Sequence, residues 1–218
     1  MPTLLHLDSS MRVEGSRSRA LSDHFARSWQ HAHADGSVIY RDLAADPVPH
    51  LDLHAFTANL VADEDRTAAQ REARALTETL AGEVLAADEI VIGMPLYNFA
   101  APSTVKAWLD RIVVPGLTVD PGGRGLAGGR RVTVTAARGG GYGPGTPRHG
   151  WDHREPWLAL ALSTVGIDDI RVIHAELTLS RESPKMSGLE DLEDQSIADA
   201  HAAIDAVFGR SAESDLAA

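Results

Sequence analysis

The sequence predicts an α/β fold in which a parallel sheet is covered by helices on both faces. Short apolar runs alternate with helical patterns along the chain, which is typical of βαβ units. The 218 residues, 44% of them hydrophobic, are enough to bury one sizeable core. We find no linker that would divide the chain. We therefore expect a single domain over residues 1–210 and a frayed tail over residues 211–218.

The strands are expected at the short apolar runs. These are Thr3 to Asp8, Ser37 to Asp42, Glu89 to Met94, Arg131 to Ala136 and Ile170 to Leu177. The helices are expected where apolar residues recur at helical spacing. They cover Ser18 to Gln30, Asp63 to Ala87, a segment that starts at Pro102 and Ser103, Glu155 to Val165, and Leu189 to Phe208.

Composition excludes several classes of protein. The chain has no cysteine, which removes disulfides, thiolate catalysis and zinc–thiolate sites, and which fits a reducing compartment. Its formal charge is −11, so its overall field repels nucleic acid and anionic membranes. No window approaches the roughly 18 apolar residues of a membrane span. We therefore expect a soluble, cytoplasmic protein without nucleic-acid or membrane partners, in which any anionic ligand is held by a local site.

The turn after the third strand can bind a flat heterocycle. It contains Pro95, Leu96, Tyr97, Asn98 and Phe99, and it joins the strand to an amphipathic helix. In an open parallel sheet, ligands bind at the carboxyl ends of the strands. Backbone polar groups, one amide and two aromatic rings suit the isoalloxazine ring of a flavin. A plain connection with two core aromatics is the alternative interpretation.

The loop after the first strand can hold a phosphate. It offers the hydroxyls of Ser10, Ser16 and Ser18 and the charges of Arg17 and Arg19, and it leads directly into a helix. Backbone N–H groups at a helix N-terminus attract anions. A single serine here would be interpreted as a helix cap, but three serines with two arginines favour an anion site. No Walker motif is present.

Two glycine-rich strings differ in their position relative to a strand. Gly123 to Gly128 has the spacing of a dinucleotide fingerprint, but it precedes a strand, so we interpret it as a flexible loop. The string from Ala137 through Arg138, Gly139 and Gly140 to Tyr142 follows a strand. Its glycines allow the backbone to approach a ligand closely, although a permissive turn explains them equally well.

Metal and hydrolase chemistry find little support in the sequence. Ten histidines are present, but the groups around His31 and His149 have no open-site signature such as His-Glu-x-x-His. No Gly-x-Ser-x-Gly elbow marks a serine nucleophile. We expect no metal site.

Taken in order, the three loops resemble those of the FMN-dependent NADH-azoreductases, a family of flavodoxin-like quinone reductases. Members of that family carry Ser-x-Ser at the first helix, Met-Tyr-Asn-Phe after the third strand and Ser-Arg-Gly-Gly after the fourth. The matching segments here are Ser16-Arg17-Ser18, Leu96-Tyr97-Asn98-Phe99 and Ala137-Arg138-Gly139-Gly140. The resemblance runs from about Met1 to Phe208.

The resemblance implies an open five-stranded sheet of order 2-1-3-4-5 and a bound FMN. The FMN phosphate would lie on Ser10, Ser16, Arg17 and Ser18, and its ring against Pro95 to Phe99 and against Ala137, Arg138, Gly139 and Gly140. The resemblance also implies a homodimer with the active sites at the interface. NADH or NADPH would donate a hydride, and a quinone or azo compound would accept two electrons in a ping-pong reaction. Asn98 and Tyr142 are the candidate catalytic residues, while the flavin carries the chemistry.

Some positions depart from the family pattern. Leu96 replaces a methionine and Ala137 a serine, and we expect flavin binding to survive both changes. The region from Val114 to Leu126 is shorter than usual, and Val119 stands where many members have an aromatic residue. Substrate choice would be decided there.

Two other functions remain open at this point. A flavodoxin-type carrier would transfer single electrons and stay monomeric. A non-catalytic, flavin-binding regulatory module would keep the fold without turnover.

Overall fold

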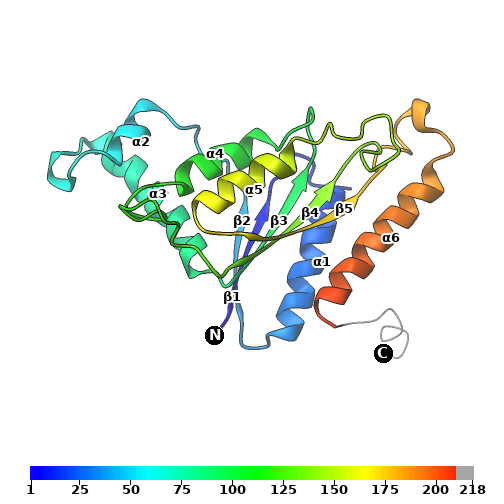
Figure 1. Ribbon diagram of the computed structural model, residues 1–218, viewed down its shortest axis with the longest axis horizontal. Coiled ribbons are helices and arrows are strands. Elements are labelled where there is room, and N and C mark those ends of the chain that lie inside the picture. Colours follow the sequence, from blue (N-terminus) through cyan, green and yellow to red (C-terminus); the bar gives the residue numbers. More distant parts are fainter. Residues whose placement is uncertain (210–218) are drawn as a thin grey trace.

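A five-stranded parallel sheet lies between two layers of helices in the computed structural model, which describes residues 1–209 (Figure 1). The strands are β1 (Thr3–Asp8), β2 (Ser37–Asp42), β3 (Glu89–Pro95), β4 (Arg131–Ala137) and β5 (Asp169–Ala175). Their order is β2-β1-β3-β4-β5, and all neighbours pair in parallel. The sheet order implied by the family resemblance is confirmed. The tail expected at residues 211–218 lies outside the described residues.

The helices divide between the two faces of the sheet. They are α1 (Arg17–Ala32), α2 (Leu53–Ala58), α3 (Ala68–Ala86), α4 (Ser103–Ile112), α5 (Arg154–Thr164) and α6 (Glu190–Val207). Helices α1 and α6 pack together on one face, whereas α3, α4 and α5 cover the other. The short helix α2 projects at one end, beside α3 (Figure 1).

Each strand contributes side chains to two cores, because successive residues point to opposite faces of the sheet. In β3, Ile90 and Ile92 pack with Trp108 under α3, α4 and α5. Between them, Val91 packs with Phe25 under α1 and α6. Burial on both faces explains why the apolar run of β3 does not alternate with polar residues.

Two predicted elements ended or began at other residues than expected, and one helix was not predicted. The helix expected from Asp63 begins at Ala68, because Thr67 and Gln70 form a capping box that starts a helix there, and Asp63–Asp65 is a separate 3-10 turn. The strand expected to reach Leu177 ends at Ala175, since Leu177 has a left-handed φ of 60°. Helix α2 was missed, because six residues are too few to show a helical period.

The glycine string before β4 is closely packed, and its interpretation as a flexible loop is corrected. A Cβ atom on Gly125 would collide with the backbone of Val165 and Gly166, at the end of α5. The amide of Ala127 donates to the carbonyl of Val165 at 2.8 Å. Val119, expected near the substrate, is buried in the core beneath α3, α4 and α5. The close approach of the backbone at the end of α5 therefore explains why residue 125 is a glycine.

Candidate functional site

A cavity of about 340 Å³ opens at the carboxyl ends of β1, β3 and β4. The predicted site residues that line it are Ser10, Ser16, Arg17, Ser18, Pro95, Leu96, Tyr97, Ala137, Gly139, Gly140 and Tyr142. Three loops that are far apart in the sequence thus form one site. Asn98, Phe99 and Arg138, which were also predicted, are not among the residues that line this cavity.

The N-terminus of α1 provides free hydrogen-bond donors at the first loop. Ser16 caps the helix, because its Oγ accepts from the backbone N of Arg19 at 3.4 Å, and it lies 3.3 Å from Oγ of Ser18. Within residues 1–209, the backbone N–H groups of Arg17 and Ser18 have no hydrogen-bond partner. Two free N–H groups and two hydroxyls at a helix N-terminus suit a phosphate.

Arg19 fixes the conformation of this loop. Its guanidinium donates to the carbonyl oxygen of Ser10, from Nε at 3.2 Å and from Nη2 at 2.7 Å. It also forms an ion pair with Asp42 at 2.7 Å, and the hydrogen bond from Arg19 lowers the pKa of Asp42 below its ordinary value. The sequence suggested the charge of Arg19 as a ligand for an anion. In the structure, this guanidinium instead fixes the shape of the loop.

Asp8, at the end of β1, belongs to the same buried network. Its Oδ1 accepts from Oγ of Ser22 at 2.7 Å and its Oδ2 from the hydroxyl of Tyr40 at 3.1 Å. Burial, together with the nearby carboxylate of Asp8, raises the pKa of Tyr40 to about 12, so this hydroxyl stays protonated at neutral pH. Gly93 is required beside Asp8, because a Cβ atom there would collide with Oδ1. Asp8 therefore links β1 to α1 and β2.

The arginines at the serine end of the cavity have carboxylate partners. Nη2 of Arg17 lies 3.0 Å from Oε1 of Glu193, a side chain that is only 1% exposed. Arg12 forms a two-pronged ion pair with Glu182, one contact being 2.9 Å between Nη2 and Oε2. The hydrogen-bond donors that remain available to a ligand at this end are therefore mostly neutral N–H and O–H groups.

The glycine segment after β4 offers a second set of free donors. The carbonyls of Gly139 and Gly140 accept from the amides of Leu179 and Leu177, both at 3.3 Å. The amides of residues 139–141 have no hydrogen-bond partner within residues 1–209. The amide of Leu96 donates to the carbonyl of Ala137 at 2.8 Å, which fixes the spacing of the two walls. Such walls suit a flat ring with a polar edge.

Asn98 and Phe99 lie at the tip of a tight turn. Tyr97 and Ala100 exchange two backbone hydrogen bonds of 3.0 Å, and the two residues between them have left-handed φ values of 47° and 70°. Two adjacent left-handed residues without glycine are strained. The side chain of Asn98 is exposed and forms no hydrogen bond within residues 1–209, whereas Phe99 packs edge-on against Trp151 at 5.5 Å. Neither side chain is among those that line the cavity.

The side chain of Arg138 lies in a cluster of charges behind the glycine segment. Nε is 2.9 Å from Asp152, Nη1 is 2.9 Å from Glu176, and Nη2 contacts Glu155. Burial and the like charge of Arg138 lower the pKa of His174 in the same cluster. Oε1 of Glu176 also accepts from the amide of Tyr142 at 2.9 Å. Arg138 thus positions the loop that carries Tyr142.

Besides Arg12 and Gly15 of the first loop, sequence reasoning missed two contributors to the cavity. One is Arg148, which carries no recognisable motif. The other is the segment after β5, whose cavity-lining members are Thr178, Leu179, Ser183 and Met186. The expectation that β5 reaches Leu177 concealed the turn that brings this segment over the cavity. A search for Ser and Thr after each strand end would have found part of it.

Neither a membrane helix nor a metal cluster is found in the described part of the chain. Over residues 1–209, no helix is both long and apolar enough to cross a bilayer. Over the same range, no three His, Cys, Asp or Glu side chains are grouped so that they could hold a metal ion.

Known sequences resemble this chain over almost its whole length. A family described as having a flavodoxin-like fold matches residues 2–198. An FMN-dependent NADH:quinone oxidoreductase of Frankia casuarinae is 46% identical over 205 residues, which cover 93% of this chain and 97% of that protein. A protein of the same name from Streptomyces avermitilis is 43% identical over 202 residues, covering 92% and 93% of the two chains.

Solved structures share the fold at lower identity. An azoreductase from Bacillus anthracis superposes with a TM-score of 0.82 at 22% identity, covering 95% of this chain and 99% of the other. An FMN-dependent NADH-azoreductase of the same species, in complex with FMN, has a TM-score of 0.79 at 20% identity, covering 94% and 99%. At these identities the structures show a common fold.

Proposed function

The chain belongs to the family of FMN-dependent NADH:quinone oxidoreductases, which have a flavodoxin-like fold, and we propose that it uses NADH and bound FMN to reduce quinones or azo compounds. The observation that carries this proposal is the pattern of free donors in one cavity. Within residues 1–209, unpartnered amides beside the hydroxyls of Ser16 and Ser18 at the start of α1 suit the phosphate, and unpartnered amides of residues 139–141 suit the polar edge of the ring. The residues present therefore fit FMN.

The chain supplies binding and orientation for this chemistry. Bound FMN would supply the two-electron chemistry between NADH and the acceptor, which we propose to follow a ping-pong order. Ser10, Ser16, Arg17 and Ser18 would hold the phosphate, and Pro95, Leu96 and Tyr97 would lie along the ring opposite Ala137, Gly139 and Gly140. Asn98 and Phe99 would contribute through the backbone of their turn, and Arg138 through the loop of Tyr142. The proposal includes the cytoplasm as the location, where NADH is available.

Quinone-dependent oxidation of NADH tests the proposed function. The protein with added FMN is expected to oxidise NADH rapidly when a quinone is present and slowly without it. NADPH, compared in parallel, establishes the preferred donor. Failure to bind FMN would contradict the proposal. Binding of FMN without any quinone-dependent oxidation would also contradict it, and would leave a flavodoxin-type carrier or a flavin-binding regulatory module.

Replacing Arg19 with glutamine is expected to weaken FMN binding about tenfold, or about 1.4 kcal/mol. The carbonyl of Ser10 loses both hydrogen bonds that fix the phosphate loop. The pair between Arg19 and Asp42 is fully formed above the ordinary pKa of aspartate and is lost as the pH falls through the lowered pKa of Asp42, so titrations belong at neutral pH. Quenching of flavin fluorescence measures the affinity.

Arg27 provides the matched control for that variant. It lies on the same helix, is exposed, and pairs with Asp23 at the surface. Arg27→Gln is expected to bind FMN like the unmodified protein. If the two variants bind FMN equally well, Arg19 does not hold the loop.

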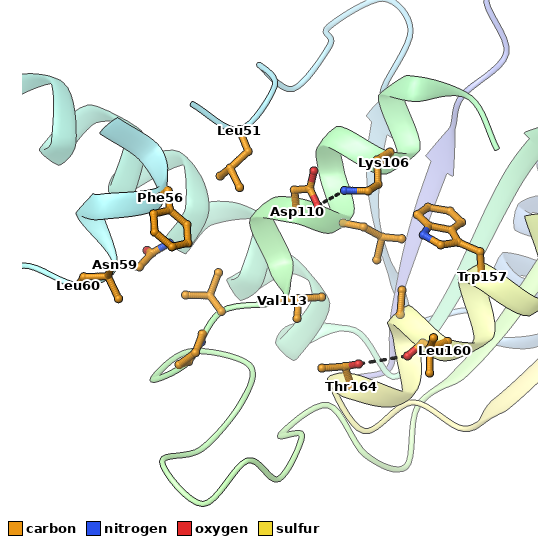
Figure 2. Close-up of a pocket in the computed structure, with 14 residues that line it drawn as sticks. Leu51, Phe56, Asn59, Leu60, Lys106, Asp110, Val113, Trp157, Leu160 and Thr164 are labelled. Atoms are coloured by element: carbon orange, nitrogen blue, oxygen red, sulfur yellow. Dashed lines mark hydrogen bonds and ion pairs between the residues drawn. The ribbon is translucent and has the colours of Figure 1, made fainter. Parts of the chain in front are cut away.

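We also propose that the protein is a homodimer, because an apolar groove lies between α2, α4 and α5. Figure 2 shows this groove, of about 500 Å³, with Phe56 and Leu60 on one side and Trp157 and Leu160 on the other. Phe56 is 54% exposed, and Leu60 and Leu160 are each 71% exposed. Exposed apolar patches of this kind mark protein interfaces. Both α4 and α5 begin directly after loops at the cavity end of the sheet, so a partner on this face would adjoin the cavity.

Leu160→Glu is expected to shift the protein from dimer to monomer, because it places a charge in the proposed interface. Analytical ultracentrifugation measures the change. Leu192→Glu is the control, since Leu192 is also exposed, at 55%, but lies on α6 across the sheet. A dimer that withstands Leu160→Glu, or an unmodified protein that is monomeric, would contradict this assignment.

A further inference from the structure

We infer that Arg148 selects electron acceptors that carry an acidic group, such as a sulfonate or carboxylate, on their aromatic ring. This inference rests on the proposed function. Arg148 lines the cavity, and its guanidinium lies 5.7 Å from the centre of the Tyr142 ring. Nη1 donates to the hydroxyl of Tyr142 at 3.2 Å. The side chain is thus held over one wall of the cavity while it remains exposed.

The charge of Arg148 is available to a ligand. Arg12 and Arg17, which also line the cavity, are paired with Glu182 and Glu193. Arg148 forms no ion pair within the described range, residues 1–209, and its hydrogen bond to Tyr142 leaves Nε and Nη2 without a protein partner. In a chain of net charge −11, the general field repels anionic compounds. A local cation with free donors offsets this repulsion where Arg148 stands.

The position of Arg148 indicates which molecule it contacts. A Cβ atom on Gly140 would lie 3.1 Å from Nη1, so the guanidinium lies against the glycine segment and belongs to the ring wall of the cavity. The phosphate donors stand on the other loop, at the start of α1. In NADH a ribose separates the phosphates from the nicotinamide, whereas an acidic substituent on a quinone or azo compound is attached to the reacting ring system. An anion held at Arg148 therefore fits the acceptor best.

Tyr142 adds a neutral donor beside this cation. Its hydroxyl accepts the hydrogen bond from Arg148, so its own proton is free to be donated. Tyr142 is buried, and the guanidinium of Arg138 lies 6.0 Å from its ring. An acceptor could thus meet a fixed hydroxyl and a cation at adjacent points.

Two quinones that differ by one sulfonate test this inference. The kcat/KM for 1,2-naphthoquinone-4-sulfonate divided by that for 1,2-naphthoquinone measures the preference. In Arg148→Gln this ratio is expected to fall about tenfold, the effect of one charge-assisted hydrogen bond of about 1.5 kcal/mol. The ratio in Arg148→Lys is expected to lie between those of the unmodified protein and Arg148→Gln, because lysine keeps the charge but lacks the planar fork of donors. Added salt is expected to lower the ratio in the unmodified protein more than in Arg148→Gln.

The control removes an equal charge elsewhere. Arg124 is 80% exposed, pairs with Asp120 and is not among the residues that line the cavity, so Arg124→Gln is expected to keep the ratio.

Binding of naphthalene-2-sulfonate, which cannot be reduced, is expected to weaken about tenfold in Arg148→Gln by calorimetry. This measurement tests the inference even if turnover is absent.

A ratio that stays constant in Arg148→Gln would overturn the inference, whether the two quinones keep their kcat/KM or lose it by the same factor. If anaerobic reduction by NADH slows as well, that result would show that Arg148 holds the dinucleotide. Failure of the proposed function would be recognised separately, because the unmodified protein would then not turn over either quinone.

Discussion

Replacing Ser16 and Ser18 together with alanine is expected to weaken FMN binding about a hundredfold. Each hydroxyl would donate to a charged phosphate oxygen, and such hydrogen bonds contribute about 1.5 kcal/mol or more each. The two hydroxyl oxygens lie 3.3 Å apart beside the free amides of Arg17 and Ser18, so they can act on one phosphate. Titration with FMN, followed by flavin fluorescence, measures the loss.

Riboflavin separates a phosphate contact from a structural role. It has the ring without the phosphate, so its affinity is expected to be equal in the double variant and the unmodified protein. Removing the cap of α1 costs about 1 kcal/mol of stability, and thermal unfolding shows whether the variant stays folded. Ser163→Ala, an exposed serine on α5, controls for the loss of a hydroxyl. If FMN and riboflavin weaken equally, the phosphate lies elsewhere.

Replacing Arg138 with glutamine is expected to lower the free energy of unfolding by about 3–5 kcal/mol. Arg138 is 7% exposed, and its guanidinium contacts the carboxylates of Asp152, Glu155 and Glu176. Removing the cation leaves these carboxylates with fewer partners in a mostly buried site. Denaturant unfolding measures the change. Flavin affinity is expected to fall as well, because Glu176 also holds the amide of Tyr142.

Arg131 supplies the contrast, because it forms its ion pair in solvent. It lies 2.9 Å from Asp169, and the two side chains are 47% and 62% exposed. Arg131→Gln is expected to cost less than about 1 kcal/mol. If Arg138→Gln also costs less than that, the cluster is not what positions the loop of Tyr142.

The sheet and most of the cavity could be predicted from local sequence. Each strand is a short apolar run, and each is followed by a loop with its own chemistry, such as Ser16 and Ser18 after β1 or Gly139 and Gly140 after β4. The carboxyl ends of parallel strands meet at one edge of the sheet, so loops at those ends meet as well. The loops that follow the parallel strands can therefore be predicted to form one common site.

Side-chain direction could not be predicted in the same way. Asn98 and Phe99 stand in the expected turn, but neither residue is among those that line the cavity. Arg138 follows β4 as expected, yet the carboxylates that hold it come from Asp152, Glu155 and Glu176. Arg148 is held at the cavity by its hydrogen bond to Tyr142, and no sequence motif predicts this contact. These positions depend on tertiary contacts between segments distant in sequence.

An anaerobic titration of the FMN-loaded protein tests the central claim most directly. NADH is added until the visible flavin absorption is lost, and a quinone is then added while the absorption is followed. The proposed function predicts that one equivalent of NADH bleaches each bound FMN and that one equivalent of quinone restores the colour. Absorption that NADH leaves unchanged, or that the quinone fails to restore, would contradict it.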